Sequence, residues 1–249
     1  MQVFRRAVVA LIAAASAHGA AQAADLGVRG DASSDRPAAL ANWSGVFVGL
    51  DSGYDWSRSN WTFTNNSNTN THAVDGGEAG FHLGVQRQLG HFVYGLEAGA
   101  NWLQASGQSN CPNPTYQCRT EVRGLEALQA RLGLADGSWL IYGTAGLAFE
   151  QVKHSTPNAT TPANTESVAL HTAHGWVLGA GMERKLTPQI SLGAVAQHYV
   201  FDTEGNSLIN DADGTTHAYT QFATRGQNVL QVRLTYQFDP LPDRHVPLK

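Results

Sequence analysis

The stretch WSGVFVGLDSGYDW, residues Trp43–Trp56, decides the fold. Its even-numbered positions are mostly apolar or aromatic, whereas the odd-numbered positions between the tryptophans are glycine, aspartate and one phenylalanine. This period of two predicts a β-strand rather than a helix. The stretch is longer than an ordinary strand of about 17–20 Å, and about 9–11 tilted residues cross a bilayer. We therefore interpret it as one strand of a transmembrane β-barrel, with aromatic residues at both membrane interfaces.

Further stretches repeat the alternation along the rest of the sequence. They lie at 77–88, 92–102, 122–134, 139–151, 172–184, 190–201 and 227–238. The segments between consecutive stretches are alternately long and short, and the long ones are rich in Asn, Ser, Thr, Asp and Gly. Short turns at one end and long loops at the other are typical of up-and-down outer-membrane barrels. The sequence thus predicts an all-β fold, an eight-stranded antiparallel up-and-down transmembrane β-barrel with four long exposed loops.

The ends of the chain are expected to lie outside this barrel. Residues 1–23 have the pattern of a signal peptide: Arg5-Arg6, an apolar run over 7–17, and an Ala-x-Ala cleavage site at Ala21–Ala23. We expect a periplasmic leader over 24–42, the barrel over 43–238 and a C-terminal extension over 239–249.

The composition is consistent with a β-barrel and argues against a nucleic-acid partner. Charged residues make up 14% of the chain, and it contains 26 glycines. The mean hydropathy of -0.25 is low for a membrane protein, but only alternate residues of a barrel strand face lipid. The net charge of -4 and pI of about 6.2 argue against a nucleic-acid partner.

Charged residues fall on the inward faces of the predicted strands. They are Asp51, Asp55, Glu97, Arg131, Glu183 and Arg233. The interior of an eight-stranded barrel is just wide enough for side chains, and buried charges must pair to avoid a large cost. We expect Glu/Arg ion pairs that plug the lumen. The alternative is a charged filter in a conducting pore.

Aromatic residues near the strand ends are predicted to form the two interfacial girdles. This set comprises Trp43, Tyr54, Trp56, Trp102, Trp139, Trp176, Tyr236 and Phe238. Cys111 and Cys118 lie in one polar segment of an exported chain, and we expect them to form a disulfide.

No cofactor or metal site is predicted. His171 and His174 are three residues apart, which on a strand places them on opposite faces. No histidine is followed by serine two positions later, the arrangement that would place both residues on one face, as in lipid A deacylases. We therefore expect no catalytic residues.

Several motifs together resemble one family. They are ADL (24–26), the stretch quoted above, YGLEAGANW (94–102), ARLGLADGSWLIYGTAGLAF (130–149), GWVLGAGMERKLTPQISL (175–192) and NVLQVRLTYQF (228–238). The chain resembles the small outer-membrane β-barrel proteins of Gram-negative bacteria, of the opacity and outer-membrane immunogenic type often filed as "porin family". The resemblance implies an eight-stranded barrel in the cell outer membrane, inserted by the barrel-assembly machinery. Such chains usually end on the aromatic residue of the last strand, whereas here 239–249 follow Phe238.

Three functions follow from these observations. The first is a non-enzymatic envelope protein whose loops carry surface recognition, with outer-membrane lipid and lipopolysaccharide as neighbours and a surface receptor as a possible partner. The alternative is a narrow porin-like channel for small polar solutes. A second alternative is a barrel enzyme that modifies lipid A.

Overall fold

A computed structural model describes residues 41–64, 67–158, 160–161 and 165–238. The predicted signal peptide, nearly all of the predicted leader and the C-terminal extension lie outside these residues. Within them the chain forms nine strands: β1 (Gly45–Phe63), β2 (Thr69–Leu89), β3 (Phe92–Asn110), β4 (Gln117–Asp136), β5 (Trp139–Thr156), β6 (Glu166–Lys185), β7 (Ile190–Phe201), β8 (Glu204–Asn210) and β9 (Thr216–Gln237). No helix among the described residues is long and apolar enough to cross a membrane.

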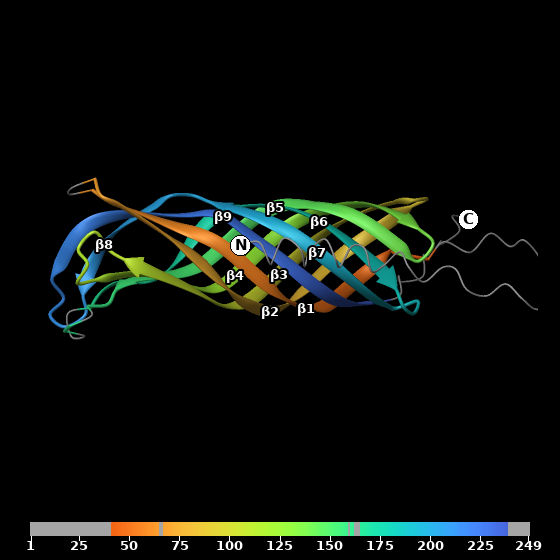
Figure 1. Cartoon of the computed structure of the whole chain (residues 1–249). Coiled ribbons are helices and arrows are strands. Elements are labelled where there is room, and N and C mark those ends of the chain that lie inside the picture. Colours follow the sequence, from red (N-terminus) through yellow and green to blue (C-terminus); the bar gives the residue numbers. More distant parts are fainter. Residues whose placement is uncertain (1–40, 65–66, 159, 162–164, 239–249) are drawn as a thin grey trace, which may run out of the picture. The chain divides into compact units, whose positions relative to one another are not determined.

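The strands form one antiparallel sheet that closes on itself (Figure 1). Consecutive strands pair from β1 to β7, and β9 pairs with β1 to close the ring. β7 and β8 both pair with β6 on one side and with β9 on the other. They follow one another along the barrel and together fill one position of the ring. The predicted all-β, antiparallel up-and-down barrel is therefore confirmed, with eight positions around the ring in the described residues.

Most of the segments that were expected to be long loops are strands instead. The β1–β2 ladder continues to the pair Thr62↔Thr69, and the β3–β4 ladder continues to Asn110↔Gln117. β8 lies entirely inside another such segment. The expectation of four long loops is wrong because polar residues were read as loop residues, although the alternation of period two continues through them.

Lipid-facing side chains form a belt around the half of the barrel with the short turns. The belt comprises 46–56, 79–89, 92–102, 128–134, 139–147, 176–182, 190–196 and 230–238, where most outward side chains are apolar or aromatic. Ten residue steps, as in 46–56, extend about 33 Å along a strand and about 23 Å along the axis of a barrel with a tilt of about 45°. This height matches the apolar band of about 25 Å that outer-membrane barrels carry. We call the opposite end of the barrel the tip, and the part between the belt and the tip the extension.

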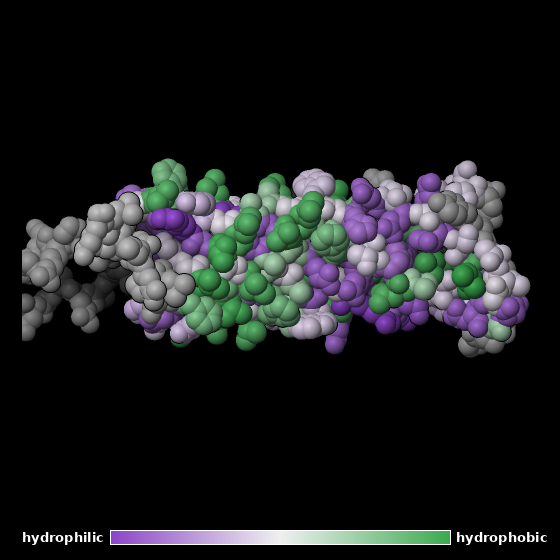
Figure 2. Space-filling view, turned by 180° about the vertical axis from the view of Figure 1, so that it is seen from behind, coloured by the Kyte–Doolittle hydropathy of each residue, from purple (hydrophilic) through white to green (hydrophobic). Residues whose placement is uncertain are grey.

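The two faces of the sheet exchange character where the belt ends. In the extension, Arg58, Asn60 and Thr62 of β1 point outward, whereas Ser59 and Trp61 are buried inside. Apolar side chains fill this interior in two clusters, one of which contains Trp61, Val168, Leu208 and Phe222. Figure 2 shows the result on the surface, where apolar residues gather over one half of the barrel and hydrophilic residues predominate over the other. The extension is therefore built like a water-soluble barrel that continues a membrane barrel.

Candidate functional site

The belt encloses a network of ion pairs. Arg131 binds Glu97 (Nη1–Oε2 3.2 Å) and Glu183 (Nη2–Oε1 2.7 Å). Arg233 binds the same Glu97 (Nη2–Oε1 2.7 Å) and also Asp51 (Nε–Oδ1 3.0 Å). All five side chains are at most 3% exposed. Five of the six charged residues singled out from the sequence are thus joined into one network across the lumen.

Neutral groups complete the contacts of this network. Arg131 lies 3.7 Å from the centre of the Tyr142 ring, and Arg233 donates to the hydroxyl of that tyrosine (Nη1–Oη 3.1 Å). Gln129 donates to Glu97, and Ser191 donates to Glu183. Charges buried in this way are tolerated because each carboxylate accepts several hydrogen bonds.

Glycines make room for two of the long inward side chains. The first is Glu183, which faces Gly193 across the β6–β7 ladder, where a Cβ would lie 2.3 Å from Cγ of the glutamate. The second is His82, whose Nδ1 lies 2.9 Å from Oδ1 of Asp51. A Cβ at Gly49 would lie 2.3 Å from Cε1 of that histidine. His82 was not singled out from the sequence, although it lies inward on β2 directly opposite Gly49.

A second group of acidic residues lies between this network and the extension. Gln227 donates to Asp55 (Nε2–Oδ2 2.6 Å), and Thr224 donates to Glu150 (Oγ1–Oε2 3.0 Å). Both oxygens of Glu78 are buried beside the side chain of Gln231, and neither makes a hydrogen bond of good geometry within the described part of the chain. The prediction that Asp55 belongs to the ion-pair network is wrong, because no arginine lies within ion-pair distance of it among the described side chains. Glu78 and Glu150 lie at inward positions of the predicted strands 77–88 and 139–151, but they were not singled out from the sequence.

Histidines occupy the interior of the extension. Nε2 of His72 lies 3.0 Å from Oγ1 of Thr120, and Nδ1 of His154 lies 3.2 Å from the same hydroxyl. The ring of His154 stacks on Phe222 with 4.0 Å between centres, and the edge of Trp61 packs against it. Burial lowers the pKa of His72 to about 4. Burial also lowers the pKa of His154 well below its ordinary value, and the neighbouring imidazoles His171 and His72 lower it further.

A tryptophan is buried inside the short-turn end of the barrel. Trp43 is 1% exposed and packs in a cluster with Val93, Leu140 and Tyr142. Its backbone N–H donates to Oε1 of Gln88 (2.8 Å). The assignment of Trp43 to a lipid-facing girdle is therefore wrong. The residue precedes the first strand and turns into the barrel mouth, where burial of a large aromatic surface is favourable.

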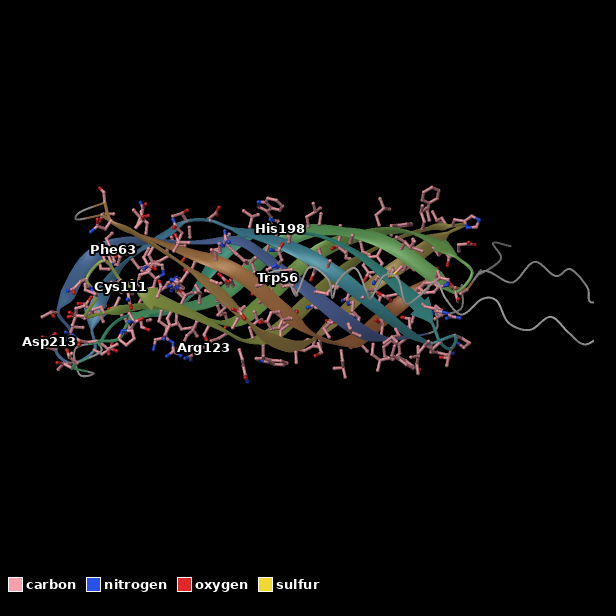
Figure 3. All side chains as sticks on the ribbon, in the orientation of Figure 1. Trp56, Phe63, Cys111, Arg123, His198 and Asp213 are labelled. Atoms are coloured by element: carbon pink, nitrogen blue, oxygen red, sulfur yellow. A yellow bond between two sulfur atoms is a disulfide. The ribbon has the colours of Figure 1, made fainter. Side chains whose placement is uncertain are left out.

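The other aromatic residues assigned to the girdles are exposed at the two edges of the belt. Tyr54, Trp56, Trp102 and Trp176 lie at the edge next to the extension, and Trp139, Tyr236 and Phe238 at the short-turn edge. Figure 3 shows Trp56 near the middle of the barrel, whereas Phe63, Cys111 and Asp213 lie toward the tip.

The predicted disulfide is present at the tip. Cys111 and Cys118 are joined across the connection between β3 and β4, with Cα atoms 5.0 Å apart. Both residues pack in the apolar cluster that contains Trp61. The disulfide therefore ties the tip to the interior of the extension.

The interior consists of successive layers of packed side chains. From the short-turn end these are the Trp43 cluster, the ion-pair network, the acidic group, and the apolar and histidine-containing extension. Among the described residues, no group of three or more His, Cys, Asp or Glu side chains could hold a metal ion.

The closed antiparallel ring, the apolar belt and its aromatic edges define a transmembrane β-barrel of the outer-membrane class. The sequence model described as "Outer membrane protein beta-barrel domain" matches residues 7–238, and the chain belongs to this family. The predicted family resemblance is thereby confirmed, as is location in the outer membrane.

Relatives and a solved structure agree with this assignment. The 25 kDa outer-membrane immunogenic protein of Brucella abortus is 31% identical over 182 residues, which cover 69% of this chain and 74% of that protein. The 31 kDa outer-membrane immunogenic protein of Brucella melitensis is 25% identical over 222 residues, which cover 81% and 86% of the two chains. The crystal structure of OprG from Pseudomonas aeruginosa shares the fold, with a TM-score of 0.53, 11% identity and coverage of 79% of this chain and 97% of that one.

Proposed function

We propose that the protein is a non-enzymatic component of the outer membrane that contributes to envelope structure and to recognition at the cell surface. Its lumen is proposed to be closed to solutes. Short turns face the periplasm in barrels of this class, so the extension and its tip face the outside of the cell.

The observation that carries this proposal is the ion-pair network in the belt. Arg131 and Arg233 bind a shared carboxylate from different strands, so the network spans the lumen rather than lining its wall. Removing one member of a buried pair leaves the other charge uncompensated, at a cost of about 3–5 kcal/mol. A solute would have to break several such contacts to pass, and it would still meet the Trp43 cluster and the extension.

The recognition part of the proposal rests on the extension. Paired strands hold its outward polar residues, and the disulfide and the apolar clusters fix the interior behind them. Substitutions of these outward residues would leave the packed interior intact. Such a surface can therefore vary in sequence, and so in what it recognises, without loss of the fold. The Brucella relatives are named as immunogenic proteins, and this supports an exposed surface for the present chain. The surface differs from the expected one, since it consists largely of strands and their short connections.

Single-channel recording in planar bilayers tests the closure. The full chain, folded in detergent and checked for faster migration on an unboiled gel, is added to the bilayer under an applied voltage. We expect no discrete conductance, while a general porin added to the same chamber shows steps. Reproducible steps from the folded protein, absent after boiling, would establish the alternative of a narrow channel and overturn the closed lumen.

A further inference from the structure

The outer wall of the barrel carries a groove at the extracellular edge of the belt. Its volume is about 660 Å³. Three strands contribute to its lining, which consists of Trp56, Ser57, Arg58, Asn60, Thr71, Gly226 and Asn228. The closed lumen plays no part in this groove.

A local irregularity of the sheet produces the hollow. The β1–β9 register shifts between Trp56 and Arg58, opposite a glycine of β9 with a positive φ. That residue, Gly226, has φ 62°, a backbone conformation that favours glycine. A Cβ built on it would meet only Cε1 of His198, at 3.9 Å. The space above the bulge is therefore open.

Hydrogen bonds orient the neutral polar side chains of the groove. The amide of Asn228 donates to the carbonyl of Gly226 (2.6 Å), and its oxygen lies 2.9 Å from Nδ1 of His198. The hydroxyl of Thr71 donates to the side-chain oxygen of Asn60. These side chains are held in place before a ligand arrives, which reduces the entropy that binding must overcome.

The groove is apolar at the end next to the belt and polar at the end next to the extension. Trp56 is 44% exposed, and the lipid-facing Tyr54 and Leu230 continue from it toward the membrane. Arg58, two residues along β1 in the other direction, carries the charge of the lining. Asp75 pairs with Trp56 in the sheet, but its carboxylate accepts a hydrogen bond from Tyr54, on the membrane side.

We propose that this groove binds the phosphorylated sugar head of an outer-leaflet glycolipid. Arg58 pairs with a phosphate, since guanidinium and phosphate groups form strong charge-assisted hydrogen bonds. Asn60, Thr71 and Asn228 supply the neutral hydrogen-bonding groups that sugar hydroxyls require, and Trp56 covers a sugar face. The acyl chains lie along the belt below. A phospholipid with a single phosphodiester would leave most of these polar groups unused.

Native mass spectrometry of the full chain in detergent micelles tests this site. The probe is diphosphoryl lipid A, titrated against the natural sequence and against Arg58→Gln and Trp56→Leu. Matched controls are Arg123→Gln, which changes another exposed arginine above the belt (Figure 3), and Trp102→Leu, which changes another exposed tryptophan at the same edge. We expect Arg58→Gln to weaken binding about tenfold or more, as the loss of a charge-assisted contact requires, and Trp56→Leu to weaken it measurably. The controls are expected to bind as the natural sequence does.

Two results would overturn the proposal. One is an equal loss in Arg58→Gln and Arg123→Gln, which would show attraction to surface charge without a site. The other is binding of phosphatidylglycerol as tight as that of lipid A, which would show a phosphate contact without recognition of the sugar. The site depends on location in the outer membrane and not on closure of the lumen, so channel recording and this titration can fail independently. The same spectra report the mass of lipid A, and a change in its acyl chains would contradict the non-enzymatic function.

Discussion

The guanidinium group of Arg131 is held on both sides inside the membrane-spanning part of the barrel. It bridges Glu97 of β3 and Glu183 of β6 at 3.2 and 2.7 Å, while its plane covers the ring of Tyr142. The pairing matters because these three side chains are only 1% exposed, and an unpaired buried charge is costly. An arginine on the outer surface has no such role: Arg123 is 54% exposed and binds Glu121 at 2.9 Å in contact with solvent.

These two arginines provide a matched prediction at the residue scale. Arg131→Gln leaves the buried Glu183 without its cation and Glu97 with Arg233 alone, and we expect it to lower the free energy of unfolding by about 3–5 kcal/mol. Arg123→Gln removes an exposed ion pair, for which about 0–1 kcal/mol is expected. Urea titrations of both variants in lipid vesicles, with unboiled gel migration as the check on folding, measure the difference. Equal urea midpoints would mean that the network does not stabilise the barrel.

At the scale of elements, β2 and β5 carry into the extension two histidines that burial keeps neutral. His72 and His154 both contact Trp61 and the hydroxyl of Thr120, and His154 also stacks on Phe222. Asn70 contacts the first ring, and the second lies beside His171, which pairs with Glu204. Protonation of either buried ring would place a positive charge in this largely apolar layer.

The lowered pKa values predict a destabilisation by acid. A histidine whose pKa falls on folding binds more protons in the unfolded chain, so stability is lost as the pH decreases below the unfolded value of about 6.5. For His72 this loss continues down to its folded pKa of about 4. We expect the urea midpoint of the natural sequence to fall relative to that of a His72→Gln/His154→Gln variant between pH 6.5 and 4. Parallel pH profiles of the two proteins would contradict neutral histidines in the folded extension.

At the scale of the whole molecule, the alternation of side chains was sufficient to predict a closed antiparallel barrel and its lipid-facing belt. The positions of Leu50, Leu132 and Leu234, all exposed on the belt, follow from the period of two alone. The extension was missed because there the apolar residues move to the inner face: Trp61 and Val74 are buried, whereas Arg58 and Thr71 point outward. A strand that is recognised only by its outward apolar residues would therefore end where the faces exchange character, although the alternation of period two continues beyond that point.

The composition of the interior could be predicted less fully. The alternation identified the charged residues that point inward. Which of them form ion pairs depends on which side chains meet across the lumen, and the order of the strands in the sheet does not determine that. Arg131 and Arg233 converge on Glu97, whereas Asp55 binds a glutamine instead. Trp43 shows a similar limit, since the alternation does not say which way a residue ahead of the first strand turns.

The exchange of apolar residues from the outer face to the inner face predicts that the belt lies in the hydrocarbon and that the extension lies outside it. Trp176 is exposed at the edge of the belt, whereas Thr62 points outward from the extension, beyond the hydrocarbon. We expect brominated lipid chains to quench strongly the fluorescence of a variant that retains only Trp176. They should leave a variant whose only tryptophan is introduced by Thr62→Trp nearly unaffected, because this quenching requires contact with lipid chains and the outer surface of the extension lies beyond them. Gel migration before boiling shows that both variants are folded. Equal quenching would place the extension within the lipid, where Arg58 and Asn60 would face hydrocarbon at a cost of several kcal/mol. The groove at the belt edge could not then contact lipid headgroups, so this measurement also decides whether the glycolipid site lies at the membrane surface.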